Sequence, residues 1–191
     1  LVALRRHGPK PVTTATVQRN SDQVGSAVRR LMEVNPNGVV VVSAYVSSAA
    51  LATAMRERGS RAQIMNVSFV GTKALQQAMP VGVSNGIGVA QVVPFPWNRW
   101  IPVVAEYQKL MRLNSEDPGF GFTSLEGFLA ARLITDALNR AGPDPTRDSL
   151  VKGLESIRDF DLGGFRIDMD RDDHQASDFV ELTFLGSQSW E

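Results

Sequence analysis

Residues 38–43 limit what this chain can fold into more than any other segment. Four consecutive valines lie there between a glycine and a serine. A short apolar run of this kind predicts a strand of a parallel sheet that is buried on both faces. Ser47 or Ser48 can cap a helix that follows it. Tyr45 is therefore expected just past the carboxyl end of the strand, where open α/β sheets bind their ligands.

Strand and helix patterns alternate through the first half of the chain. Strands are predicted at residues 12–17, 39–43, 63–68 and 87–93, and helices at residues 21–34, 47–58 and 72–78. This alternation predicts right-handed βαβ units and an α/β fold with a doubly wound parallel sheet.

The pattern changes after Pro94 and Pro96, which favour a stiff crossover because neither a central strand nor a helix continues through them. Three helices are then predicted, at residues 102–113, 123–140 and 146–157, the second with capping-box spacing at residues 123–126. No buried strand lies among them. Two further strands are predicted, at residues 164–168 and 179–185, short segments with the mixed polarity of edge or hinge strands. We expect these helices to pack on a sheet that lies upstream of Leu1, outside this chain.

The composition excludes several classes of function. Twenty basic residues balance twenty acidic ones, which gives no electrostatic reason to expect nucleic acid as a partner. Cysteine is absent, so disulfides, thiolate catalysis and zinc-thiolate sites are excluded. Neither of the two histidines has a metal-ligating partner at helical spacing. We therefore expect no metal site, no cofactor and no catalytic residue.

Two segments imitate known ligand motifs without completing them. Residues 168–173 resemble the start of a calcium loop, but Asp173 stands where glycine is needed and Phe179 where a bidentate glutamate is needed. Residues 82–88 are rich in glycine, but they precede a predicted strand, whereas a phosphate loop follows a strand and opens a helix. A solvated acidic turn and a surface turn are the better interpretations.

The loops that follow the predicted strands carry the best candidate site. Ser43 and Tyr45 follow one strand, Ser68 and Phe69 follow the next, and Phe95 lies beyond the fourth. Hydroxyl groups mixed with aromatic faces are typical of a site for a small molecule. The alternative, about equally weighted for each aromatic residue, is that these rings only pack under loops.

Several segments together resemble the periplasmic solute-binding proteins of branched-chain amino-acid-type ABC transporters, the type I periplasmic binding proteins. These segments are PVTTATVQRN (11–20), GVVVVSAY (38–45), GSRAQIMNVSFVG (59–71), QVVPFPW (91–97) and FTSLEGF (122–128). The similarity extends over essentially the whole chain.

The resemblance implies two α/β lobes joined by crossovers, which close on a ligand by hinge motion. It implies that this chain is the carboxyl-terminal half of such a protein. Residues 1–93 would be the second lobe without its first strand, which such sheets place between the strands at 12–17 and 39–43. Residues 94–177 would be first-lobe helices without most of their sheet, and residues 178–191 would return as a strand to the second lobe.

The implied function is that of an extracytoplasmic substrate-binding component, located in the periplasm or as an extracellular lipoprotein. The implied partners are a small organic ligand, a membrane permease and the missing amino-terminal half. A sensor domain of the same fold, in a receptor or transcription regulator, is one alternative. A nucleotide-using α/β enzyme is a second, disfavoured because no phosphate loop follows a strand.

The resemblance also places two residues individually. Tyr45 falls where amino-acid-binding members carry a tyrosine that contacts the ligand, and Ser68 falls where they carry the acidic residue that pairs with the ligand's ammonium group. A buried ammonium group that faces a neutral serine would lack its charge partner. Carboxylates, aromatic acids or amides are therefore expected to fit better than ordinary α-amino acids.

Overall fold

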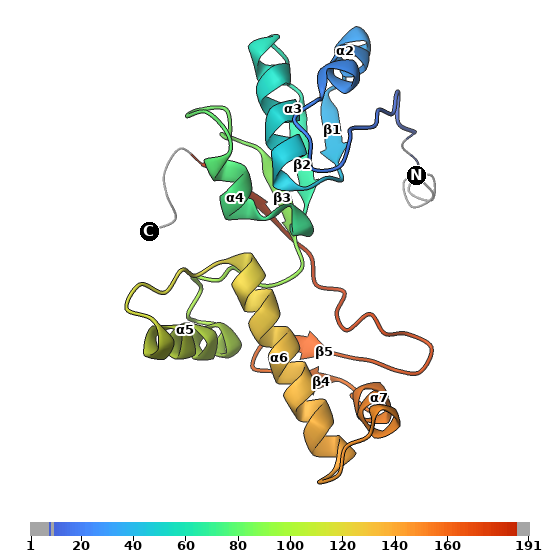
Figure 1. Ribbon diagram of the computed structural model, residues 1–191, viewed down its shortest axis with the longest axis vertical. Coiled ribbons are helices and arrows are strands. Elements are labelled where there is room, and N and C mark those ends of the chain that lie inside the picture. The colour runs from blue at the N-terminus through green and yellow to red at the C-terminus, as the bar shows by residue number, and fades with distance from the viewer. Residues whose placement is uncertain (1–7, 9, 187–191) are drawn as a thin grey trace. The chain divides into compact units, whose positions relative to one another are not determined.

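The chain forms two compact units, each with its own apolar core (Figure 1). The structure is a computed structural model that describes residue 8 and residues 10–186. The first unit comprises Leu1–Ala90 with Leu182–Glu191, and the second comprises Gln91–Glu181. The assignment of these parts to two lobes of a larger protein stays a prediction.

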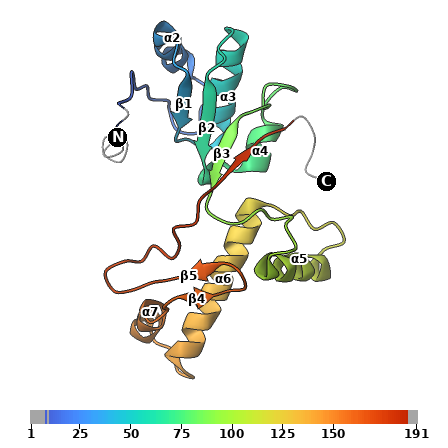
Figure 2. The ribbon, with the colours of Figure 1, turned by 180° about the vertical axis from the view of Figure 1, so that it is seen from behind.

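The first unit contains a four-stranded sheet, seen from behind in Figure 2. Its strands are β1 (Gly38–Val41), β2 (Gln63–Val67), β3 (Gly88–Gln91) and β6 (Glu181–Phe184), in the order β1-β2-β3-β6. The first three are parallel, as the sequence predicts. The Leu185 N–H donates to the Ile87 carbonyl and the Thr183 hydroxyl donates to the Val89 carbonyl, so β6 runs antiparallel to β3.

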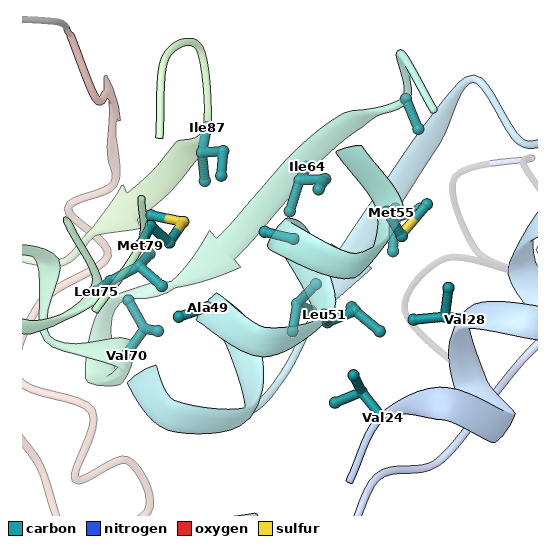
Figure 3. Packing of buried hydrophobic residues seen from close by; sticks show 14 of the residues in the cluster. Val24, Val28, Ala49, Leu51, Met55, Ile64, Val70, Leu75, Met79 and Ile87 are labelled. Atoms are coloured by element: carbon teal, nitrogen blue, oxygen red, sulfur yellow. The ribbon is translucent and has the colours of Figure 1, made fainter. Parts of the chain in front are cut away.

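Helices α2 (Gly25–Val34), α3 (Tyr45–Glu57) and α4 (Thr72–Gln77) share one core with the sheet. Figure 3 shows side chains of this core along the sheet, with Ile64 of β2 between Leu75 of α4 on one side and Met55 of α3 and Val28 of α2 on the other. The predicted helices at these places are confirmed, although α2 begins four residues later and α3 two residues earlier than predicted.

One face of β1 is open, which corrects the prediction that this strand is buried on both faces. Val39 and Val41 are buried, but Val40 and Val42 are 66% and 70% exposed. Within the residues that the structure describes, the helices supply cover only for the face that carries Val39 and Val41. Because all four residues from 39 to 42 are valine, the sequence does not indicate which face of the strand lacks a covering layer.

Residues 12–17 do not form a strand, which corrects a second prediction. This segment has no ladder partner among the described strands, and Val12 is 75% exposed. Side chains of the helices secure it instead. The Arg30 Nε donates to Thr13 Oγ1 at 3.1 Å, and the Ser47 hydroxyl donates to the Ser21 carbonyl at 2.7 Å. An extended segment becomes a strand only when a neighbour pairs with its backbone.

The second unit is built from α5 (Pro102–Asn114), α6 (Phe122–Ala141) and α7 (Arg147–Glu155), which confirms the three predicted helices. Beside them β4 (Phe160–Asp161) pairs antiparallel with β5 (Arg166–Ile167), so the predicted strand at 164–168 is one arm of a short hairpin. Their shared core includes Tyr107, Leu125 and Ile157. No helix within the described residues is long and apolar enough to cross a membrane.

The helix caps differ from the predicted ones. Ala44 occupies the N-cap position of α3 and Gly121 that of α6, and neither helix has a side-chain cap. The capping box predicted at residues 123–126 is therefore wrong, and so is the cap predicted at Ser47 or Ser48. A reciprocal box does occur at α7, between Thr146 and Ser149. A hydroxyl group placed near a helix start has other acceptors, so the residue type alone does not fix the cap.

Candidate functional site

The carboxyl edge of the parallel sheet brings two pairs of predicted site residues to one side of the first unit. Val41 of β1 and Asn66 of β2 are register partners near the ends of their strands. Ser43 and Ser68 each lie two residues beyond that pair, and Tyr45 and Phe69 follow them. Since both strands are parallel, all four residues follow strand ends on the same edge.

Tyr45 is the first residue of α3 and is 43% exposed. The first intrahelical bond runs from the Ser48 N–H to the Ala44 carbonyl at 3.1 Å. The N–H groups of residues 45–47 precede that bond, so they point out of the helix start without intrahelical acceptors. They add a positive partial charge at the backbone of Tyr45, which suits a negatively charged ligand group.

Two serines fix the helix start. The Ser47 side chain is buried, and it bridges α3 to the segment before α2 through the carbonyls of Gln18 and Ser21 and the N–H of Ser21. The Ser48 hydroxyl donates to the Ser43 carbonyl at 3.3 Å. The Ser48 bond ties the first turn of α3 to the strand end, and the Ser47 bonds tie the same turn to Gln18 and Ser21, so together they hold the backbone on which Ser43 and Tyr45 stand.

Phe69 lies in the 3₁₀ turn η1 (Ser68–Val70) that follows β2. Val70 is buried in the core, whereas Phe69 is 63% exposed. Gly71 ends the turn at φ 75°, a conformation that favours glycine. The buried valine and the tight turn thus present the phenylalanine ring outward, beside Ser68.

A groove of about 1000 Å³ leads to this edge. It runs between residues 10–20 and β1, and Ala27, Leu31 and Leu51 contribute to its apolar wall. At one end it reaches Ser43, Ala44, Ser47 and Phe69. The structure therefore joins Ser43 and Phe69 in one concave surface of mixed polar and apolar character.

Phe95 belongs to the second unit and packs in an aromatic cluster there. Its ring centroid lies 5.1 Å from that of Trp97 and 6.1 Å from that of Phe122. The ring is half-buried beside the core of that unit. This is the packing role that the sequence analysis kept open as an alternative, and contact between Phe95 and a ligand stays a prediction.

Asn66 is a residue that the sequence analysis missed. Its side chain is buried near the end of β2, and its Nδ2 donates to the Gly88 carbonyl at 3.4 Å. Its Oδ1 has no hydrogen-bond partner among the described residues. The available signal was an amide inside the otherwise apolar segment 64–67.

The acidic segment 168–173 forms a surface turn in the second unit. The Asp170 carboxylate accepts the N–H groups of Asp172 and Asp173 at 2.7 Å each. These two bonds lower the pKa of Asp170 below its usual value, since they stabilise the charged form. No group of three potential metal ligands occurs in the described part of the chain.

A family model described as periplasmic binding protein matches residues 2–183. A search of curated proteins found no match. Among solved structures, the chain is similar to a possible leucine/isoleucine/valine-binding protein from Rhodopirellula baltica SH 1, with 31% identity and a TM-score of 0.89 over 98% of this chain and 52% of the other.

Two further structures extend the comparison. A substrate-binding periplasmic protein from Ralstonia solanacearum is 28% identical, with a TM-score of 0.84 over 97% of this chain and 53% of the other. A fatty acid ABC transporter substrate-binding protein from Thermomonospora curvata is 19% identical, with a TM-score of 0.71 over 85% of this chain and 42% of the other, and shows the fold alone. This chain spans about half the length of the structures that it matches.

Proposed function

Because this chain belongs to the periplasmic binding protein family, we propose that it is part of the extracytoplasmic substrate-binding component of an ABC transporter. The protein would hold a small organic ligand between two hinged lobes and would carry out no chemistry on it. The observation that carries the proposal is the edge of the sheet in the first unit, where Ser43, Tyr45 and Phe69 follow the ends of parallel strands.

The ligand class follows from the charges at this edge. The start of α3 offers backbone N–H groups, and Ser43, Tyr45 and Ser68 carry hydroxyl groups after strand ends on the same edge of the sheet, so this edge is rich in donors for a carboxylate. No acidic side chain stands at these positions to pair with an ammonium group. A carboxylate or an aromatic acid, with Phe69 against its apolar part, is therefore the preferred ligand, ahead of a simple α-amino acid.

The proposed partners follow from the family. They are a membrane permease that accepts the loaded binding protein, and the remainder of the binding protein itself, since this chain spans only about half the length of its structural relatives. The proposed location is the periplasm or, for a lipoprotein, the outer side of the cell membrane.

A ligand screen on the full-length protein tests the proposal. Thermal shift followed by calorimetry should give tight binding of an organic or aromatic acid. Tyr45→Ala should weaken that binding at least tenfold, whereas Val81→Ala, at a fully exposed position outside this edge, should leave it unchanged. Tight leucine binding that Ser68→Ala abolishes would contradict the ligand class, and a response to nucleotides alone would contradict the transport function.

A further inference from the structure

The chain contains two asparagine–glycine pairs, Asn37–Gly38 and Asn85–Gly86. Asparagine is one of the thermolabile residue types. In such a pair the backbone nitrogen of the glycine can attack the side-chain carboxamide of the asparagine, because glycine has no Cβ to hinder the approach and leaves the backbone mobile. All four residues are exposed, so water reaches both pairs. The hydrogen bonds around the two glycines distinguish them.

The Asn85–Gly86 pair is held in a closed turn. The Gly86 N–H donates to the Leu185 carbonyl at 2.9 Å, and the Ile87 N–H donates to the Ser84 carbonyl at 3.0 Å. Gly86 has a φ of 76° in this turn. The Gly86 nitrogen must give up its acceptor before it can attack the asparagine side chain, and breaking that hydrogen bond costs free energy. The folded structure therefore opposes the reaction at this pair.

The Gly38 N–H has no such restraint. The Gln63 N–H donates to the Asn37 carbonyl at 2.8 Å, so that carbonyl points toward β2. The carbonyl and the N–H of a trans peptide group point in opposite directions. The Gly38 N–H therefore points away from β2, into the groove that Gly38 lines. In the described part of the chain, this N–H has no hydrogen-bond acceptor, and no strand pairs with that edge of β1.

The position of Asn37 also favours the reaction. Asn37 lies between the end of α2 and the start of β1, so neither a helix nor a strand fixes its backbone. The hydrogen bond that its carbonyl accepts from Gln63 polarises the peptide group, which makes the Gly38 N–H easier to deprotonate. An exposed carboxamide and an unbonded, polarised N–H thus stand on neighbouring residues.

We propose that Asn37 is a site of spontaneous deamidation and that the turn at Asn85 protects the second pair. The Gly38 nitrogen loses its proton and forms a bond to Cγ of Asn37, and Nδ2 leaves with a proton as ammonia. One water molecule then opens the resulting succinimide ring. Addition of water at Cγ gives aspartate, and addition at the backbone carbonyl carbon gives isoaspartate. The reaction consumes one water and releases one ammonia, without oxidation or reduction, and it does not depend on the proposed function.

Isoaspartate at residue 37 would change the start of the sheet. The backbone would run through the former side chain and gain a methylene group, and the carbonyl that accepts the Gln63 N–H would become part of a free carboxylate. That hydrogen bond opens the ladder between β1 and β2, where Gly38 and Gln63 are register partners. The modification therefore acts at the amino end of β1, whereas Ser43 and Tyr45 follow its carboxyl end.

Peptide mapping by mass spectrometry tests the proposal on the folded chain. The protein is incubated in mildly alkaline buffer made with oxygen-18 water, and deamidation at each asparagine is followed over time. Ring opening places a labelled oxygen at residue 37, which distinguishes this reaction from deamidation before the incubation. We expect Asn37 to react at least tenfold faster than Asn85. Equal rates, a faster reaction at Asn85, or no labelled product at residue 37 would overturn the proposal.

The unfolded chain is the control for the effect of sequence. In urea above the unfolding transition, the Gly86 N–H no longer binds the Leu185 carbonyl, so the two glycines differ only in their neighbours along the chain. The rates at Asn37 and Asn85 should then agree within threefold. If the ratio of the two rates is the same in the folded and the unfolded chain, the hydrogen bonds of the fold do not cause the difference, and the proposal fails.

Two variants test the attack itself. Gly38→Ala should slow the reaction at Asn37 at least tenfold because a Cβ hinders the nitrogen, and the fold accommodates it, since the nearest neighbour of that Cβ would be the Gln63 carbonyl oxygen at 3.8 Å. Asn37→Gln keeps the glycine but moves the carboxamide one methylene group away, and it should slow the reaction at residue 37 at least tenfold as well. Circular dichroism checks that both variants fold. A folded variant of either kind that reacts as fast as the wild type would refute attack by the Gly38 nitrogen.

Discussion

Ser47→Ala should loosen the connection between α3 and the segment before α2 more than its burial alone suggests. The hydroxyl lies 2.7 Å from the Ser21 carbonyl oxygen, 3.3 Å from the Ser21 nitrogen and 3.3 Å from the Gln18 carbonyl oxygen. Removal breaks at least two hydrogen bonds, each worth about 0.5–1.5 kcal/mol. We expect a loss of about 2 kcal/mol in the free energy of unfolding, which lowers the melting temperature by about 4–8 °C for a chain of this size.

Ser48→Ala is the matched control. Its side chain is equally buried, but the one hydrogen bond that this hydroxyl makes to the described residues, to the Ser43 carbonyl at 3.3 Å, is local. Alanine favours the helix by up to about 0.7 kcal/mol, which offsets most of that lost bond. Scanning calorimetry measures the stability of both variants, and amide exchange measures the Ser21 N–H. Equal melting temperatures, or unchanged Ser21 exchange in Ser47→Ala, would refute the bridging role.

Two further predictions concern the second unit. Gly153→Ala should destabilise this unit by about 1–2 kcal/mol despite a helix propensity gain of about 1 kcal/mol, because a Cβ there would lie 2.5 Å from the Ala137 carbonyl oxygen. Gly127→Ala in α6, with open space around it, should instead raise the free energy of unfolding by about 1 kcal/mol, as measured by urea titration. Similar changes in the free energy of unfolding for the two variants would contradict the close contact between α6 and α7. The pKa of Asp161 should lie below 3.8, the ordinary value for an aspartate side chain, because the N–H groups of Gly163 and Gly164 donate to its carboxylate. A lowered pKa in the folded state means that this group stabilises the fold above pH 3.8 and that its contribution is lost as the pH falls through the folded pKa. A carbon-13 titration that gives a normal or raised pKa would contradict the assignment.

The parallel sheet and its helices could be predicted because their signals are local. A run of valines, an amphipathic stripe and a terminal glycine each depend on a few neighbouring residues. Asn35 ends α2 at φ 42° and Gly59 follows α3 at φ 78°, so both helices end at residue types that accept a left-handed backbone. These parts of the fold required no knowledge of distant contacts.

The strand at residues 12–17 could not be predicted correctly because pairing is not local. Its sequence favours an extended backbone, and the structure has one. Whether an extended segment becomes a strand depends on a neighbour about 4.8 Å away. The burial of Val40 was misjudged for a related reason, because the face of the sheet that carries Val40 is buried only if another layer covers it, and the sequence of one strand does not specify that layer.

The candidate site was predictable in part for the same reason. The positions of Ser43, Tyr45, Ser68 and Phe69 after strand ends follow from the order of strands and helices. The role of Ser47 did not follow, because its partners lie 26 and 29 residues away in the sequence. Asn66 escaped attention since a single amide in an apolar strand gives no indication of whether its oxygen finds a donor.

Ser47 connects the groove beside β1 with the candidate ligand site. Its hydroxyl secures the wall of the groove at Gln18 and Ser21, and its backbone lies in the first turn of α3 beside Tyr45. A ligand at the carboxyl edge of the sheet would bind the helix turn that Ser47 belongs to. Ser47→Ala should therefore lower the melting temperature and weaken ligand binding together, whereas Tyr45→Ala should weaken ligand binding alone.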